Sequence, residues 1–172
     1  RMVSVAFSSE EPVERYFGSE VLDHGKDSID LKFLRSGTAP VLVDHDMKDI
    51  VGVVEKASVG QDRVARANIR FGNSERASEV WKDIEDGIRS NVSVGYRINK
   101  LVREPAEGEG LETYRATDWT PLEISIVSVP ADTSVGVGRS LLKGKSIMQN
   151  ENVKPASGDL DAHQSDAQKE RN

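Results

Sequence analysis

The sequence predicts a mainly β domain of the α+β class, a closed or nearly closed antiparallel β-barrel with helices on its outside. Roughly seven or more short segments rich in β-branched residues alternate apolar and polar side chains, which is typical of half-buried strands. Gly, Pro, Asn and Asp separate these segments. Only one stretch has a strong helical pattern, and a shorter one precedes it, so helices are expected to flank the strands.

The expected strands follow from alternation and from the turn residues between them. A turn at Gln61–Asp62 joins two strands into a hairpin. Thr120–Pro121 separates two others, because proline has no backbone donor for a sheet ladder. A loop rich in glycine and glutamate spans 104–112. The strands expected in chain order are 2–7, 13–22 with a bend at Gly18, 39–44, 50–59, 63–71, 92–101, 113–119, 122–129 and 135–137.

The main helix is expected to begin after Asn73 or Ser74, either of which can cap it. Its apolar residues recur at spacings of three and four, which gives one buried stripe of Ala77, Val80, Trp81, Ile84 and Ile88. A second, shorter helix is expected over 29–34, with Ser28 as its cap and Gly37 after its end.

Composition limits the classes of protein that the chain can represent. The chain has 172 residues and a net charge of -6, and 37% of its residues are hydrophobic. A negative net charge gives no electrostatic support for binding nucleic acid. No apolar run approaches the roughly 18 residues that a membrane span needs. Cysteine is absent, which excludes disulfides and thiolate chemistry and fits a reducing compartment.

The domain organisation is expected to be one folded unit over 1–139 and a polar linker or tail over 140–172. The tail has no aromatic residue and few large apolar ones, so it cannot bury enough surface to offset its ordering entropy. Within it, 141–148 could form a helix against a partner. The chain opens on Arg1–Met2, so we expect either a fragment or an added residue at the start.

The strongest chemical signal is the stretch Asn91–Tyr96, in which Ser93 stands between Val92 and Val94. Strand alternation turns Ser93 to the face opposite both valines. Gly95 lets the backbone bend there or lets another backbone segment approach closely. A nucleophilic serine needs a fixed backbone and open space before it, and this stretch offers both. The alternative is a strand serine that bonds only its neighbours, and Ser125 is the next serine to consider as nucleophile.

A serine nucleophile needs an imidazole base, and the chain has three histidines, His24, His45 and His163. His163 lies in the predicted tail, and His24 lies in a polar turn where solvation is expected. His45 follows an apolar strand directly, so its backbone is held and its ring can point into a cleft. The alternative for His45 is a hydrogen-bonded histidine that only ends a strand.

The third member of such a site is an acid that orients the imidazole, and Glu123 is the preferred residue. It is an isolated acid in an apolar strand, where a charge must be paired, exposed or shifted in pKa. An exposed strand glutamate is the alternative reading. Asp46 remains open as the orienting acid. A metal site built from Asp44, His45 and Asp46 together with Asp23 and His24 fits no tetrahedral zinc spacing, so no metal or other cofactor is expected.

These residues carry a resemblance to a known family. Five short motifs, in order, resemble the HK97-type prohead proteases of tailed phages: Pro40 to Asp46, Ile50 to Val54, Gly87 to Ser90, Asn91 to Tyr96 and Leu122 to Ala131. The resemblance covers about 2–139. The stretch 8–18 resembles the start of a subset in which the protease is fused to a capsid protein.

The resemblance implies a fold similar to the herpesvirus assembly proteases, a β-barrel wrapped by helices. It implies a serine endopeptidase with Ser93 as nucleophile, His45 as general base and Glu123 as third residue. It implies action on scaffold or capsid protein inside the immature capsid, in the host bacterial cytoplasm, with self-association as a further option. Backbone N–H groups near Ser93 or Gly95 are candidates for the oxyanion hole. The alternative function is an inactive barrel that serves assembly or binds peptide without cleaving it.

Overall fold

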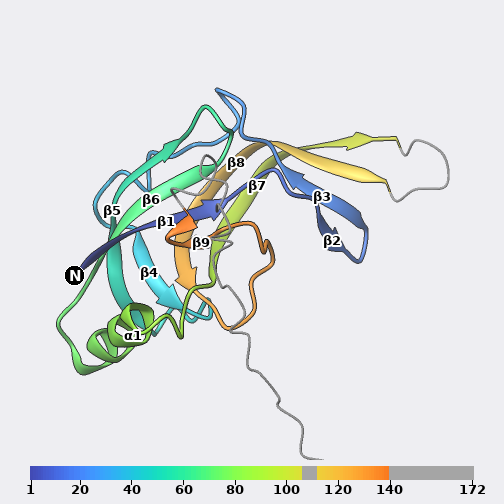
Figure 1. Cartoon of the computed structure of the whole chain (residues 1–172). Helices are drawn as coiled ribbons and strands as arrows, with labels where there is room; N and C mark the ends of the chain where they lie inside the picture. Colours follow the sequence, from blue (N-terminus) through green and yellow to red (C-terminus); the bar gives the residue numbers. More distant parts are fainter. Residues whose placement is uncertain (106–111, 140–172) are drawn as a thin grey trace, which may run out of the picture.

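The structure is a computed structural model that describes residues 1–105 and 112–139. It is mainly β, with one mixed nine-strand sheet and, within the described residues, a single helix (Figure 1). The expected loop over 104–112 and the expected tail from 140 onward lie mostly or wholly outside these residues. The elements are β1 (Met2–Ser8), β2 (Val13–Arg15), β3 (Gly18–Leu22), β4 (Pro40–Val43), β5 (Ile50–Val59), β6 (Ala65–Phe71), α1 (Glu75–Glu85), β7 (Val92–Glu104), β8 (Thr113–Ile126) and β9 (Gly136–Val137).

The sheet differs from the predicted barrel in closure and in strand direction. Its strands follow the order β2-β3-β8-β4-β5-β6-β1-β9, with β7 paired to β8, and it does not close into a barrel. Both β3 and β4 run parallel to β8. The expectation of an antiparallel barrel was therefore wrong. The two-residue alternation on which it rested is the same in parallel and antiparallel strands, so it carries no information on direction.

Strand β8 is longer than predicted and organises the site. The expected strands 113–119 and 122–129 form one continuous strand, Thr113–Ile126, which pairs along most of its length with β7. The register shifts between Gly95 and Tyr96, opposite Pro121, so the ladder accommodates the proline with an irregularity and continues. The hairpin of β5 and β6 is confirmed by their antiparallel pairing.

Helix α1 is confirmed, with Ser74 as its cap, since the Ser74 hydroxyl accepts the Ala77 N–H at 3.2 Å. It ends before Ile88, whose side chain is 72% exposed and does not extend the buried stripe. The expected second helix after Ser28 does not form. That segment bonds β8 instead: Trp119 N–H donates to the Ser28 carbonyl at 2.9 Å, and Asp30 N–H donates to the Trp119 carbonyl at 3.0 Å.

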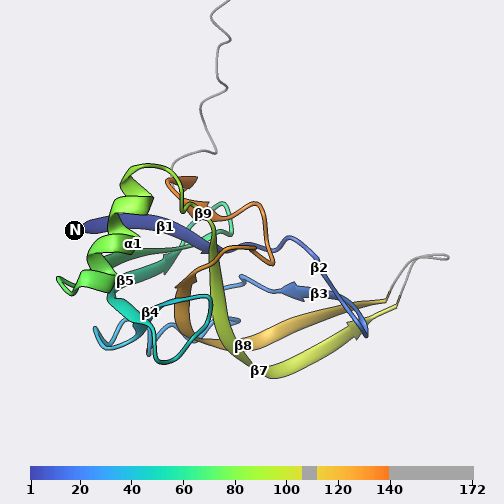
Figure 2. The ribbon, with the colours of Figure 1, turned by 90° about the horizontal axis from the view of Figure 1, so that it is seen from below.

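The fold places its helix and its extended strands at opposite ends. In Figure 2, α1 covers one end of the sheet, and the outer parts of β7 and β8 form an arm at the other end. The apolar core lies between them and includes large buried side chains such as Trp119, Phe7 and Leu34. No helix in the described part of the chain is long and apolar enough to cross a membrane.

Candidate active site

Two strands bring the predicted nucleophile and acid to one face of the sheet. Ser93 of β7 lies opposite Ser125 of β8, and Gly95 lies opposite Glu123. Residues opposite each other in an antiparallel pair, and residues two apart on one strand, share a face. The side chains of Ser93, Ser125 and Glu123 therefore project to the same side of the sheet, where Gly95 has no side chain. Ser93 is half-buried, whereas Glu123 is 5% exposed and Ser125 is fully buried.

The turn that follows β4 carries His45 onto this same face. Asp44 and His45 adopt left-handed φ angles of 48° and 60°, which are uncommon for residues other than glycine. Hydrogen bonds to β8 and to the residues just after it hold the turn in this conformation. The Asp44 carboxylate accepts the Ser128 N–H at 2.7 Å, and the His45 N–H donates to Ser125 Oγ at 3.1 Å.

The imidazole of His45 contacts Glu123. His45 Nδ1 lies 2.6 Å from Glu123 Oε1, and Ser125 Oγ donates to Glu123 Oε2 at 2.7 Å. With Nδ1 as the donor to the carboxylate, the lone pair of a neutral imidazole is at Nε2. Gly95 provides the space for this carboxylate, because a Cβ there would lie 2.2 Å from Glu123 Oε1. The 44% exposure of the His45 side chain leaves its ring accessible.

Ser93 and His45 line the same pocket, which has a volume of about 180 Å³. Within the residues that the structure describes, no hydrogen bond joins the two side chains, and the imidazole bonds Glu123 alone. Apolar residues make up much of the remaining lining, namely Phe7, Val13, Leu22, Val92, Val94, Ala131 and Val135.

A buried polar group forms another part of the pocket wall. Glu20 is 6% exposed and accepts hydrogen bonds from Tyr96 Oη and from Arg15 Nη2, the latter at 3.2 Å. Burial is the main cause that raises the pKa of Tyr96 to about 12, and the Glu20 carboxylate adds to the shift. Tyr96 thus keeps its hydroxyl hydrogen near neutral pH and donates it to the Glu20 carboxyl group.

The other acids beside His45 point elsewhere. Asp46 Oδ1 accepts the Lys48 N–H at 2.9 Å, within its own turn, and the Asp44 carboxylate is bonded to Ser128. In the described ranges 1–105 and 112–139, no group of three His, Asp or Glu side chains is arranged to hold a metal ion. Of the candidate acids, Glu123 is the one that contacts the His45 ring.

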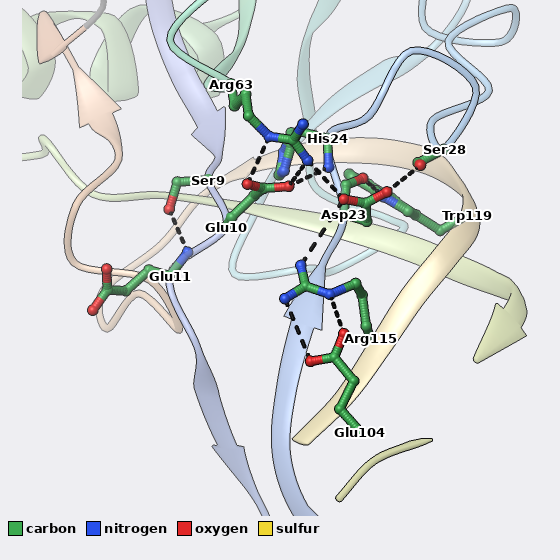
Figure 3. A network of polar contacts seen from close by, with 10 residues as sticks. All are labelled: Ser9, Glu10, Glu11, Asp23, His24, Ser28, Arg63, Glu104, Arg115 and Trp119. Atoms are coloured by element: carbon green, nitrogen blue, oxygen red, sulfur yellow. Dashed lines mark hydrogen bonds and ion pairs between the residues drawn. The ribbon is translucent and has the colours of Figure 1, made fainter. Parts of the chain in front are cut away.

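His24 lies in a second polar cluster, and its expected solvation was wrong (Figure 3). It is 3% exposed and packs edge-on against Trp119, with ring centroids 5.7 Å apart. Neither of its ring nitrogens has a hydrogen-bond partner in the described part of the chain. Burial lowers the pKa of His24, although nearby Glu10 and Asp23 and the Leu22 carbonyl favour the charged ring. This histidine is a core residue.

Charged residues surround His24 and bind one another. Arg63 bonds both Glu10 and Asp23, and the Arg63 guanidinium is the main cause that lowers the pKa of Glu10 to about 2. Ser28 Oγ donates to the Asp23 carboxylate, and Trp119 Nε1 donates to the Asp23 carbonyl at 2.9 Å. The cluster ties the segment between β3 and β4 to β8, away from the pocket.

Ser93 and His45 line one pocket, and a buried acid contacts the His45 ring behind it. A serine, a histidine and an acid are the three kinds of side chain that serine peptidases combine. The comparisons with known proteins agree with that class. Residues 10–147 match the Caudovirus prohead serine protease family, and this chain belongs to that family. The family predicted from the sequence motifs is confirmed.

One relative is a protein of Halomonas phage phiHAP-1 named major capsid protein. It is 52% identical to this chain over 136 residues. The match covers 77% of this chain but only 22% of the phage protein, so the chain spans about a fifth of its relative's length. No solved structure matches the chain.

Proposed function

We propose that this chain is a serine endopeptidase that cleaves scaffold or major capsid protein segments during phage head maturation. Ser93 is the nucleophile, His45 the general base and Glu123 the acid that orients His45. One observation carries the proposal: Ser93 and His45 line one pocket while the Nδ1 atom of His45 bonds the buried Glu123. Membership of the prohead protease family supports the same reaction.

The chemistry follows the order of these contacts. Ser93 Oγ attacks the peptide carbonyl and transfers its proton to His45 Nε2, and His45 then gives that proton to the leaving amine. His45 then takes a proton from a water molecule, which attacks the acyl-enzyme and releases Ser93 and the acid product. The Glu123 carboxylate stabilises the charged imidazole and keeps Nε2 as the free nitrogen. Because Ser93 and His45 are not bonded in the free protein, the two side chains close on each other when substrate binds.

The proposed substrate is the capsid or scaffold protein of the same phage, and the proposed place is the interior of the immature capsid. The relative named major capsid protein supports this link, because this chain matches a small part of that longer protein. A protease carried on its own capsid polypeptide would be enclosed with its substrate as the shell assembles. Attachment of this kind raises the effective substrate concentration without any added affinity.

The test compares wild-type chain with Ser93→Ala after each is mixed with the phage's capsid protein. We expect intact-mass analysis to show new capsid fragments with the wild-type chain only. Circular dichroism serves as the control that Ser93→Ala is folded. Equal cleavage by a folded Ser93→Ala chain contradicts the proposed nucleophile, and no cleavage by either chain favours an assembly module without activity.

A further inference from the structure

The fully buried hydroxyl group of Ser125 connects two members of the proposed catalytic site. Ser125 lies on β8, paired with Leu42 of β4 on one side and with Ser93 of β7 on the other. It is therefore at the centre of the three strands that supply the site. Its Oγ accepts the His45 N–H at 3.1 Å and donates to Glu123 Oε2 at 2.7 Å.

We propose that Ser125 is a positioning residue, whose hydroxyl group fixes the His45 backbone and the Glu123 carboxylate relative to each other. This inference rests on the proposed function and adds to it a residue that touches no substrate. A serine hydroxyl has one hydrogen and two acceptor lone pairs. Its hydrogen is bonded to Glu123 and its oxygen is 0% exposed, so Ser125 has no access to the pocket as a rival nucleophile.

The need for positioning comes from the His45 turn. Two successive left-handed residues, Asp44 and His45, adopt a conformation that L-residues disfavour, so the turn depends on its contacts with β8. These contacts include the Asp44 N–H with the Ile126 carbonyl at 3.0 Å, the Asp44 carboxylate with Ser128 just beyond β8, and the His45 N–H with Ser125. Of these contacts, the Ser125 hydroxyl group is the one that holds the backbone N–H of His45 itself, so its loss loosens the residue that carries the base.

The Glu123 carboxylate depends on the same hydroxyl group. Its Oε1 is held by His45 and its Oε2 by Ser125, in a site where Glu123 is 5% exposed. A buried carboxylate oxygen without a donor is unfavourable, so it turns toward another donor or recruits water. Rotation toward another donor moves Oε1 away from Nδ1, and a water in place of Ser125 no longer links the carboxylate to the His45 backbone. Removal of one oxygen atom at Ser125 therefore disturbs base and acid together.

Ser28 provides a matched control elsewhere in the molecule. It is also buried, with 7% exposure, and its Oγ donates to the carboxylate of Asp23 (Figure 3). Neither Ser28 nor Asp23 lines the pocket that contains Ser93. Ser28→Ala removes the same oxygen atom from the same kind of hydrogen bond as Ser125→Ala. A general loss of stability affects both variants, whereas a loss of positioning affects Ser125→Ala alone.

The experiment measures covalent labelling of the full chain by a fluorophosphonate, which attaches phosphorus to Ser93 Oγ and displaces fluoride. Intact mass gives the maximum labelling rate and the half-saturating concentration, with Ser93→Ala as the blank. We expect Ser125→Ala to lower the maximum rate by about 10- to 100-fold, with the half-saturating concentration unchanged, since the pocket walls stay in place. Ser28→Ala should label at the wild-type rate, and Ser125→Thr, which keeps the hydroxyl group, should recover most of the rate.

The outcomes separate this inference from the proposed function. Absence of Ser93 labelling in the wild-type chain overturns both. Wild-type labelling together with an undiminished maximum rate in Ser125→Ala overturns the role of Ser125 alone, as does an equal loss in Ser28→Ala. If Ser125→Ala does not fold, Ser125→Cys replaces it, because a thiol has similar size and is a weak donor. An undiminished rate in Ser125→Cys then overturns the role.

Discussion

The two histidines in the described residues lie in regions with the same kinds of side chain and opposite surroundings. His45 and His24 each have a carboxylate and a buried serine nearby, Glu123 with Ser125 and Asp23 with Ser28. The His45 side chain is 44% exposed and bonds its acid through Nδ1. His24 is buried, and neither of its ring nitrogens is bonded in the described part of the chain.

The difference shows that a reactive histidine requires more than suitable residue types nearby. One ring nitrogen of His45 is held while the other remains free at a pocket, which suits transfer of a proton. The ring of His24 instead packs on Trp119 as an apolar disc, and the nearby acids bind Arg63. Residue type does not separate the two sites, but access and the partner of each nitrogen do.

The largest expected effect follows from removing each ring in turn. His45→Ala should lower the rate of Ser93 labelling and of cleavage by about 10^4-fold or more, since members of a triad act as a unit. That variant should stay folded, and any loss of stability should come from Glu123 Oε1, which is left without its donor. His24→Ala should instead lower the free energy of unfolding by about 2 kcal/mol through a core cavity. Urea unfolding and labelling rates, measured on both variants, check this opposition.

Ser93→Ala should resemble His45→Ala, with a large loss of activity and a small loss of stability. It should abolish cleavage while changing stability by about 1 kcal/mol or less, and the double variant with His45→Ala should be only slightly worse than either single one. Full activity in a folded Ser93→Ala chain, or strictly multiplicative losses in the double variant, would contradict a shared catalytic unit.

The next effect distinguishes the acids near His45. Glu123→Gln should lower turnover by roughly 10^3- to 10^4-fold, because a neutral amide no longer stabilises the charged imidazole. Asp46→Asn should leave turnover near the wild-type value, since its carboxylate bonds the Lys48 N–H within the turn. Cleavage rates of the two variants, with thermal unfolding to establish folding, provide the measurement. A larger loss in Asp46→Asn reverses the assignment of the orienting acid.

A smaller effect tests the space that Gly95 leaves for the acid. Gly95→Ala places a Cβ 2.2 Å from Glu123 Oε1, so the carboxylate must move while its charge is kept. A displacement of about 1 Å at a site of this kind costs on the order of 10²-fold in rate. Gly72→Ala is the control, because its Cβ would meet no atom closer than 3.7 Å. Equal labelling rates in the two variants would show that Glu123 tolerates the displacement.

The smallest effect concerns pH and the buried His24. The pKa of His24 is lowered by burial from its ordinary value of 6.5, so the unfolded chain binds this proton more readily than the folded one. Stability is therefore complete above about pH 6.5 and falls as pH decreases, by at most about 1.4 kcal/mol per pH unit. Urea midpoints between pH 8 and 5 measure this slope.

The variant His24→Gln is the control for that slope, because it removes the titrating ring. The slope between pH 6.5 and 5 should shrink in His24→Gln. Glu10, whose pKa is about 2 instead of an ordinary 4.5, loses its stabilising charge only at more acidic pH. That loss of stability should be the same in the wild-type chain and in His24→Gln. An unchanged slope in His24→Gln would assign the acid sensitivity to other groups.

The sequence by itself determined the local elements and the candidate residues. Ser74 before an apolar stripe predicted the start of α1, and alternation on both sides of Gln61–Asp62 predicted the hairpin. The order of the short motifs around His45, Ser93 and Glu123 predicted the family. These features depend on residues close together in the chain, whose conformations are set by capping, alternation and turn chemistry.

Only the tertiary structure decided the contacts between distant segments. The parallel pairing of β3 and β4 with β8 has no local signal, because the alternation of side chains is the same for both strand directions. The open sheet and the burial of His24 depend on how distant segments pack, which no short stretch of sequence records. Which acid meets His45 depends on a turn of two left-handed residues bonded to β8. The sequence offered Ser125 only as an alternative nucleophile. Its place between base and acid arises because β8 pairs with β4 and β7 at once.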